Sequence, residues 1–80
     1  MANTKQFDIY QLIGKNIQKY RQAKGLTQAQ LADKVFMSSN FISKLESNTE
    51  QSISIDSMLI IARSLEIDIR NLFDDVEKLK

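Results

Sequence analysis

The chain contains no cysteine, histidine, proline or tryptophan, and its glycines are only Gly14 and Gly25. Without cysteine or histidine there are no disulfides, no thiol or imidazole catalysts, and no zinc or haem ligands of these types. Two glycines are too few for a phosphate-binding loop, which needs several residues with positive φ. The same scarcity disfavours architectures built from strands and tight turns. The sequence therefore predicts an all-α protein without a metal or cofactor.

Long apolar runs are also missing, and so is a strong net charge. No stretch approaches the roughly 20 apolar residues that span a bilayer, and the polar start lacks the basic and apolar regions of a secretory signal. We therefore expect a cytoplasmic protein with no membrane partner. The net charge is +1, but residues 1–24 carry five basic side chains and one acidic side chain. This basic amino-terminal third permits a polyanionic partner.

The residues that are present suffice for one small core. Of 80 residues, 42% are hydrophobic and 26% are charged, as in an ordinary globular domain. A chain of this length builds one core and not two. We predict an amino-terminal arm over residues 1–7 and a single domain over residues 8–80.

Five segments with helical apolar periodicity each follow a polar residue that can cap a helix. These residues are Asp8, Thr27, Ser38, Ser54 and Asp68. Glutamine three residues after the first two of them completes a capping box. Gly25 is expected to end the first helix in a left-handed conformation. The domain is therefore predicted to be a bundle of five helices with short connections.

Residues of one known pattern are spread in order over roughly three quarters of the chain. They are Ile13, Ile17, Arg21, Gly25, Leu26, Thr27, Gln28, Leu31, Ala32, Ser38, Ile42, Ser43, Glu46, Ala62, Leu65, Leu72 and Phe73. As an ordered set they resemble the Cro/repressor-type helix-turn-helix domain of the XRE family, which has the lambda-repressor-like fold. Phe36 and Asn48 depart from the pattern, because glycine is usual at both positions.

The resemblance implies a DNA-binding surface. In a helix-turn-helix, the second helix enters the DNA major groove while the first lies across the backbone. Residues 39–46 would be this recognition helix, and the side chains that face DNA would be Gln28, Ser38, Ser39, Asn40, Phe41, Ser43 and Lys44. Asparagine can pair with adenine and lysine with guanine, whereas Gln28 is expected at a phosphate.

Several of these residues also have a purely structural interpretation. Ser38 can be a helix cap, and Phe41 can be a packing residue. Three lysines of the first helix, Lys15, Lys19 and Lys24, either contact phosphates or lie on a solvated face. For Arg21 and Glu46, the resemblance implies a partly buried ion pair that ties the first helix to the recognition helix.

The segment from Met58 to Ala62 is too apolar for a helix that buries only one face. At 100° per residue, the expected core stripe is Ile55, Met58, Leu59, Ala62 and Leu65, whereas Ile60 points away and Ile61 lies at the margin. The resemblance places a two-fold dimer interface in this region of the fold. The predicted interface residues are Ile60, Ile61, Phe73 and Val76.

Our main hypothesis is a sequence-specific transcriptional regulator that binds double-stranded DNA as a homodimer on a roughly palindromic operator. Within the family, the chain is similar to restriction-modification controller proteins and to small phage-type repressors. Two alternatives stay open, an antitoxin with a toxin partner and a protein-interaction module that does not bind DNA. An enzyme is not expected, no small-molecule ligand is evident, and Asp74, Asp75 and Glu77 are interpreted as a solubilising tail.

Overall fold

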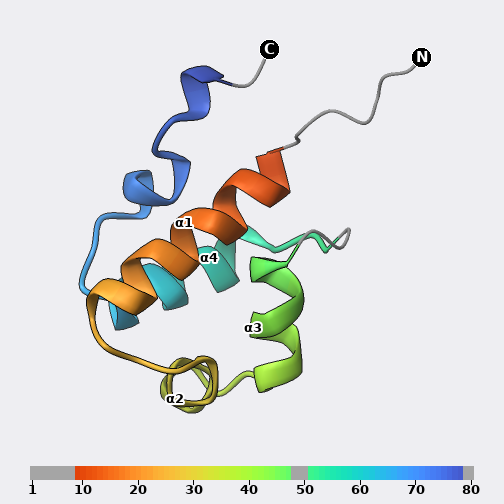
Figure 1. The fold of residues 1–80 in the computed structure, drawn as a ribbon, viewed down its shortest axis with the longest axis vertical. Coiled ribbons are helices and arrows are strands. Elements are labelled where there is room, and N and C mark those ends of the chain that lie inside the picture. Colours follow the sequence, from red (N-terminus) through yellow and green to blue (C-terminus); the bar gives the residue numbers. More distant parts are fainter. Residues whose placement is uncertain (1–8, 48–50, 79–80) are drawn as a thin grey trace.

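The computed structural model describes residues 9–47 and 51–78, which contain helices and no strand (Figure 1). The elements are α1 (Ile9–Ala23), α2 (Gln28–Lys34), α3 (Ser39–Glu46), α4 (Ile55–Ser64) and the 3₁₀ helices η1 (Ile69–Phe73) and η2 (Val76–Lys78). The all-α prediction is confirmed, with the fifth helix present as two short 3₁₀ turns. The predicted arm, the cap at Asp8 and the departure at Asn48 lie outside the described residues.

The predicted helix caps within the described residues are confirmed. Thr27 and Gln30 form a complete capping box at the start of α2. The Ser38 and Ser54 hydroxyls accept the backbone N–H groups of Phe41 and Ser57, at the starts of α3 and α4. Asp68 caps η1 in the same way. Each cap satisfies backbone donors that a helix start leaves free, so these helices begin where the sequence predicts.

Three α-helices in the described part of the chain end in one backbone motif. The residue after the C-cap is left-handed, and the next residue donates its N–H to the carbonyl oxygen five positions earlier. The left-handed residues are Gly25, Phe36 and Glu66, with φ of 73°, 57° and 59°. The closing bonds join Leu26 to Arg21, Met37 to Ala32 and Ile67 to Ala62, at 3.2, 3.0 and 3.0 Å. Each donor residue also packs against the core, so the motif fixes where each chain segment leaves its helix.

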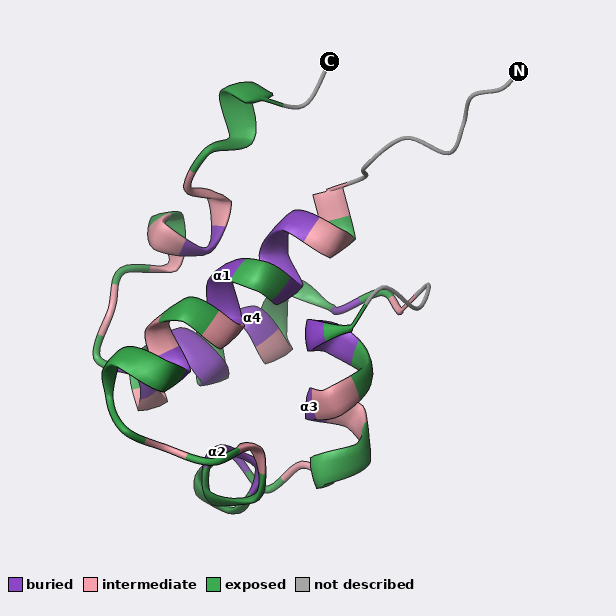
Figure 2. Ribbon diagram, in the orientation of Figure 1, coloured by how far each residue is buried: buried purple, intermediate pink, exposed green. Residues whose placement is uncertain are grey.

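The core lies between α1, α2, α3, α4 and η1 (Figure 2). Its members include Ile17, Leu31, Ile42, Ile61 and Leu72, which have no exposed surface. The predicted core stripe of the fourth helix was partly wrong. Met58, Ala62 and Leu65 are buried, but Ile55 and Leu59 are exposed, and Ile61 takes their place in the core. Because α4 has apolar residues around much of its circumference, periodicity alone did not fix the face that packs inward.

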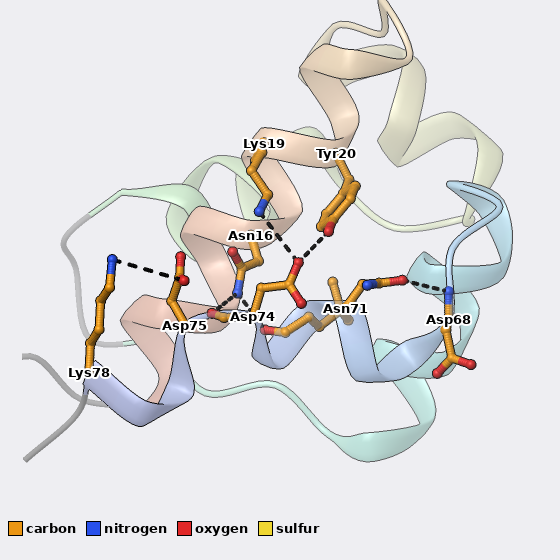
Figure 3. Close-up of polar contacts among 9 residues, drawn as sticks. Asn16, Lys19, Tyr20, Asp68, Asn71, Asp74, Asp75 and Lys78 are labelled. Atoms are coloured by element: carbon orange, nitrogen blue, oxygen red, sulfur yellow. Dashed lines mark hydrogen bonds and ion pairs between the residues drawn. The ribbon is translucent and has the colours of Figure 1, made fainter.

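The end of η1 and the residue after it are fastened to α1 by hydrogen bonds to their backbone carbonyl oxygens. The Asn16 side chain is buried and donates to the carbonyl oxygens of Leu72 and Asp74, both at 2.9 Å (Figure 3). The Asp74 carboxylate accepts hydrogen bonds from the Tyr20 hydroxyl and from Lys19 Nζ, the latter at 3.4 Å. The interpretation of Asp74 as part of a solubilising tail was therefore wrong, since this residue fastens the carboxy-terminal segment to α1.

Candidate nucleic-acid interface

The helices α2 and α3 pack against each other and are joined by residues 35–38, which gives the predicted helix-turn-helix (Figure 1). The turn is closed by the left-handed Phe36, with a φ of 57°, at the position where the sequence pattern leads one to expect glycine. Met37 follows and packs against the core. The start of α3 is thereby held at a fixed place relative to α2.

Helix α3 has one buried face and one exposed face (Figure 2). The buried face consists of Ile42, Leu45 and Glu46. The predicted DNA-facing residues lie on the other side: Ser39, Asn40 and Lys44 are exposed, and Phe41 and Ser43 are half-buried. Within the described residues the side chains of Ser39 and Asn40 make no hydrogen bond. Their donors and acceptors are therefore available to a base or a phosphate.

Ser38 serves as the N-cap of α3, because its Oγ accepts the Phe41 N–H at 3.0 Å. This role leaves the hydroxyl proton and a second lone pair, since a serine hydroxyl is one donor and two acceptors. The side chain is exposed. The cap and a contact to DNA are therefore compatible at this position.

A buried ion pair connects α1 to the end of α3. Arg21 Nε and Nη2 donate to the two carboxylate oxygens of Glu46, both at 2.8 Å, and Arg21 Nη1 donates to the Leu26 carbonyl at 2.7 Å. Both residues are buried, and the bonds to Glu46 raise the pKa of the Arg21 guanidinium. The bidentate geometry fixes both the distance and the direction of the pair. The recognition helix is thus held in one orientation on α1.

A third residue, Gln28 at the start of α2, bonds to Glu46 of this ion pair. Its Nε2 donates to Glu46 Oε1 at 3.0 Å. Sequence reasoning assigned Gln28 only to a phosphate. The amide nitrogen carries two donors, so a second N–H is available beyond the bond to Glu46. Because Gln28 is half-buried beside this pair, a phosphate that it contacts would lie at a defined distance from α3.

Gly14 is a site residue that sequence reasoning missed. A Cβ atom at this position would lie 1.7 Å from the Leu45 carbonyl oxygen, a backbone atom of α3. The axes of α1 and α3 can approach this closely only because glycine has no side chain. The available signal was a glycine inside a helix, where it costs about 1 kcal/mol relative to alanine. Gly14 and Arg21 together set the position of α3 on α1.

A family model described as helix-turn-helix matches residues 17–72, from the second half of α1 to η1. The chain belongs to this helix-turn-helix family. The resemblance to Cro/repressor-type proteins of the XRE family, with the lambda-repressor-like fold, is thereby confirmed.

Named relatives of this helix-turn-helix domain include DNA-binding regulators. The chain is 28% identical over 64 residues to the HTH-type transcriptional regulator SinR of Bacillus subtilis, covering 80% of this chain and 58% of SinR. It therefore spans little more than half the length of that relative. A crystal structure of SinR in complex with DNA matches with a TM-score of 0.73 and 29% identity, covering 78% of this chain and 98% of that one. The restriction-modification controller protein C.AhdI of Aeromonas hydrophila matches with a TM-score of 0.74 and 28% identity, covering 80% and 96%.

The three lysines predicted as possible phosphate contacts differ in their surroundings. Lys19 pairs with Asp74, and Lys24 pairs with Glu66, so both contribute to contacts within the domain. Lys15 is exposed. Of the three lysines, Lys15 has the surroundings expected for a phosphate contact or for plain solvation.

The predicted dimer residues do not all reach the surface. Ile60 is 47% exposed, Val76 is 43% exposed and Phe73 is half-buried. Ile61 has no exposed surface, so its assignment to an interface was wrong: it packs in the core of its own domain. Ile55 and Leu59, which were expected in the core, are exposed instead. The exposed large apolar side chains of α4 are therefore Ile55, Leu59 and Ile60.

None of the described helices is long and apolar enough to cross a membrane.

Proposed function

We propose that this chain is a sequence-specific DNA-binding transcriptional regulator that places α3 in the major groove of a roughly palindromic operator. One observation carries the proposal: α3 is fixed on α1 by a buried ion pair and a glycine contact, while its other face presents Ser39 and Asn40, whose side chains make no hydrogen bond within the described residues. A rigid helix with available donors and acceptors is what reading base edges requires.

The proposed roles follow the chemistry and the placement of the side chains. Asn40 and Lys44 would read bases, because an amide can pair with adenine and an ammonium with guanine. Ser39 and Ser43 would contact bases or phosphates. Gln28, Ser38 and Phe41 would lie at the sugar-phosphate backbone, where contacts position the protein without reading sequence. The relative SinR, solved in complex with DNA, supports this use of the fold.

The regulator would act as a homodimer, since one small helix-turn-helix reads few base pairs and two linked copies gain effective concentration. Such a dimer would bury exposed apolar side chains, for which the candidates are Ile55, Leu59 and Ile60 of α4 and Val76 of η2. Similarity to C.AhdI favours a restriction-modification controller, with a phage-type repressor as the neighbouring possibility.

We also infer the setting of this activity. Residues 8–80 would act as one DNA-binding domain with residues 1–7 as an arm, in the cytoplasm, where DNA is accessible. The named relatives are a transcriptional regulator and a controller protein, so the chain is proposed not to be an enzyme.

The test begins with selection of bound duplexes from a random-sequence library, followed by affinity measurements on the selected operator at several salt concentrations. We expect one enriched, roughly symmetric sequence. The logarithm of affinity should fall with the logarithm of salt at a slope of about −0.9 per phosphate neutralised. No enrichment, together with affinity that does not change with salt, would favour a protein-interaction module that does not bind DNA. Enrichment without symmetry would remove the dimer.

A further inference from the structure

The turn between α2 and α3 carries a residue whose presence the fold does not explain. Gly25, Phe36 and Glu66 occupy equivalent left-handed positions at the ends of α1, α2 and α4. Glycine meets this requirement without steric cost, whereas a bulky side chain at positive φ is disfavoured. Glu66 has a compensating contact, because its carboxylate pairs with Lys24. Phe36 has no such compensation.

The Phe36 ring makes almost no contact with its own domain. It is 96% exposed, the highest value among the large hydrophobic side chains described. Because the ring is exposed to water, it contributes no burial free energy to the fold, and the Phe36 backbone is in a conformation that phenylalanine disfavours. A strained backbone conformation that does not benefit the fold is a reason to look for a functional role of the residue. The contact that uses the ring would then lie outside this domain.

The position of Phe36 in the fold indicates which molecule its ring would contact. It lies two residues before Ser38, the cap of α3, in the connection between the two helices proposed to contact DNA. On its carboxy-terminal side Met37 packs against the core, and on its amino-terminal side the Phe36 N–H bonds to the Asp33 carbonyl oxygen at 3.4 Å. The backbone that carries the ring is therefore held firmly beside the start of the recognition helix.

We propose that Phe36 makes an apolar contact with the operator DNA at the edge of the sequence that α3 reads. This inference rests on the proposed function. DNA offers two apolar groups there, the C5-methyl of thymine, which phenylalanine is able to contact in the major groove, and the carbons of deoxyribose. The contact adds affinity that the polar residues of α3 do not supply.

The test compares Phe36→Gly and Phe36→Tyr with the wild type on the selected operator. Phe36→Gly should unfold at the same temperature as the wild type or higher, because glycine relieves the strain at positive φ. Its operator affinity should nevertheless fall by about fivefold or more, since the buried apolar contact is lost. Phe36→Tyr keeps the ring and should retain affinity within about twofold. Weaker binding by a more stable protein cannot result from unfolding.

A second series of duplexes identifies the DNA group. Thymines of the operator are replaced one at a time by deoxyuridine, which lacks only the methyl group. If Phe36 contacts a thymine methyl, one replacement weakens wild-type binding and has no further effect on Phe36→Gly. If it contacts deoxyribose, Phe36→Gly is weaker on every duplex by the same factor. Both results support the contact with DNA.

Glu66→Gly is the matched control, because it relieves the same left-handed strain at the end of α4 and lies outside the proposed DNA surface. Its affinity should stay within about twofold of the wild type at moderate salt, where a change of one charge has a small effect. Phe36→Gly binding as tightly as the wild type overturns the inference, and so does an equal loss in Glu66→Gly. Failure of the wild type itself to select any sequence would overturn the proposed function instead.

Discussion

The Arg21–Glu46 pair is the contact on which the orientation of α3 depends most directly. Both side chains are nearly removed from water, with exposed fractions of 9% and 1%. Truncating either partner leaves the other charge buried without compensation, which costs about 3–5 kcal/mol. We expect Arg21→Ala and Glu46→Ala to lower the free energy of unfolding by that amount, as measured by urea denaturation.

Arg70→Ala provides the comparison for this prediction. Arg70 pairs with Asp68 on the surface, where an ion pair contributes about 0–1 kcal/mol. An Arg21→Ala variant that loses no more stability than Arg70→Ala would show that the pair is not the joint between α1 and α3.

Asp74 gives the domain an acid-sensitive contact. The hydrogen bond from the Tyr20 hydroxyl, with a smaller contribution from Lys19, holds the pKa of the Asp74 carboxyl below its usual value. The same bond raises the pKa of Tyr20. A carboxyl whose pKa is lower in the folded state stabilises the fold above its unfolded pKa, about 3.9, and loses that effect as the pH falls through the folded value.

We therefore expect Asp74→Asn to be less stable than the wild type at neutral pH, with the difference shrinking as the pH falls well below about 4. Urea denaturation of both proteins across this range measures the effect. Asp75→Asn is the control, because Asp75 lies at 4.0 Å from Lys78 on the exposed η2 turn. A difference between wild type and Asp74→Asn that is constant with pH would contradict the assignment.

At the scale of elements, the close approach of α1 and α3 depends on Gly14. Replacing an exposed glycine in a helix by alanine stabilises it by about 1 kcal/mol. At Gly14 we predict the opposite sign, because the new methyl group would meet the Leu45 carbonyl oxygen and force α3 to move. Overpacking of this kind costs about 1–3 kcal/mol or more.

Thermal unfolding of Gly14→Ala beside Lys15→Ala, together with the operator affinity of Gly14→Ala, checks this prediction. Lys15 is the next residue of α1 and is exposed, so its replacement should change stability little. Affinity measured well below the unfolding temperature should fall in Gly14→Ala, since α3 is displaced while the domain is folded. A stabilised Gly14→Ala with full affinity would show that α3 does not need this contact.

Local features of the sequence predicted the helices well. A cap such as Thr27 or Ser38 acts within four residues, and Gly25 ends α1 through its own backbone, so the signal lies in the adjacent sequence. The inward face of α4 was not predictable in this way. Two apolar faces of α4 could have packed inward, one with Ile55 and one with Ile61. Packing against the other elements buries the face with Ile61.

Contacts between distant segments were harder to predict. The bonds of Asn16 to Leu72 and Asp74, which join positions 56 and 58 residues apart, have no local pattern that indicates them. Gly14 was visible as a glycine inside a helix, but the sequence does not reveal which backbone atom it approaches. The pair of Arg21 and Glu46 was implied by family resemblance, and the structure adds Gln28 to it.

For the whole molecule, we predict that a charge placed on the exposed side of α4 disrupts the dimer, because Ile60 is exposed there. Ile60→Asp should give a folded monomer, because a charge is tolerated in water but costly when desolvated in an interface. Operator affinity should fall more than for the loss of one base contact, since the second half-site is no longer linked. Sedimentation equilibrium, with thermal unfolding to confirm folding, measures the oligomeric state.

Gln22→Asp, a change at an exposed position of α1, should leave the dimer intact and is the control. A dimer that persists in Ile60→Asp would place the interface elsewhere. A monomeric wild type at the concentrations that bind DNA would remove dimerisation from the mechanism.

Reading of DNA by α3 is tested by the affinity of Asn40→Ala/Lys44→Ala for the selected operator and for a scrambled duplex. Each replaced side chain, if it makes a good base contact, should cost about 1–3 kcal/mol on the operator. Because both residues are exposed, the variant should fold like the wild type. We expect its preference for the operator over the scrambled duplex to disappear largely, while weak, salt-dependent binding to both persists. A folded double variant with wild-type affinity and preference would contradict this role of α3.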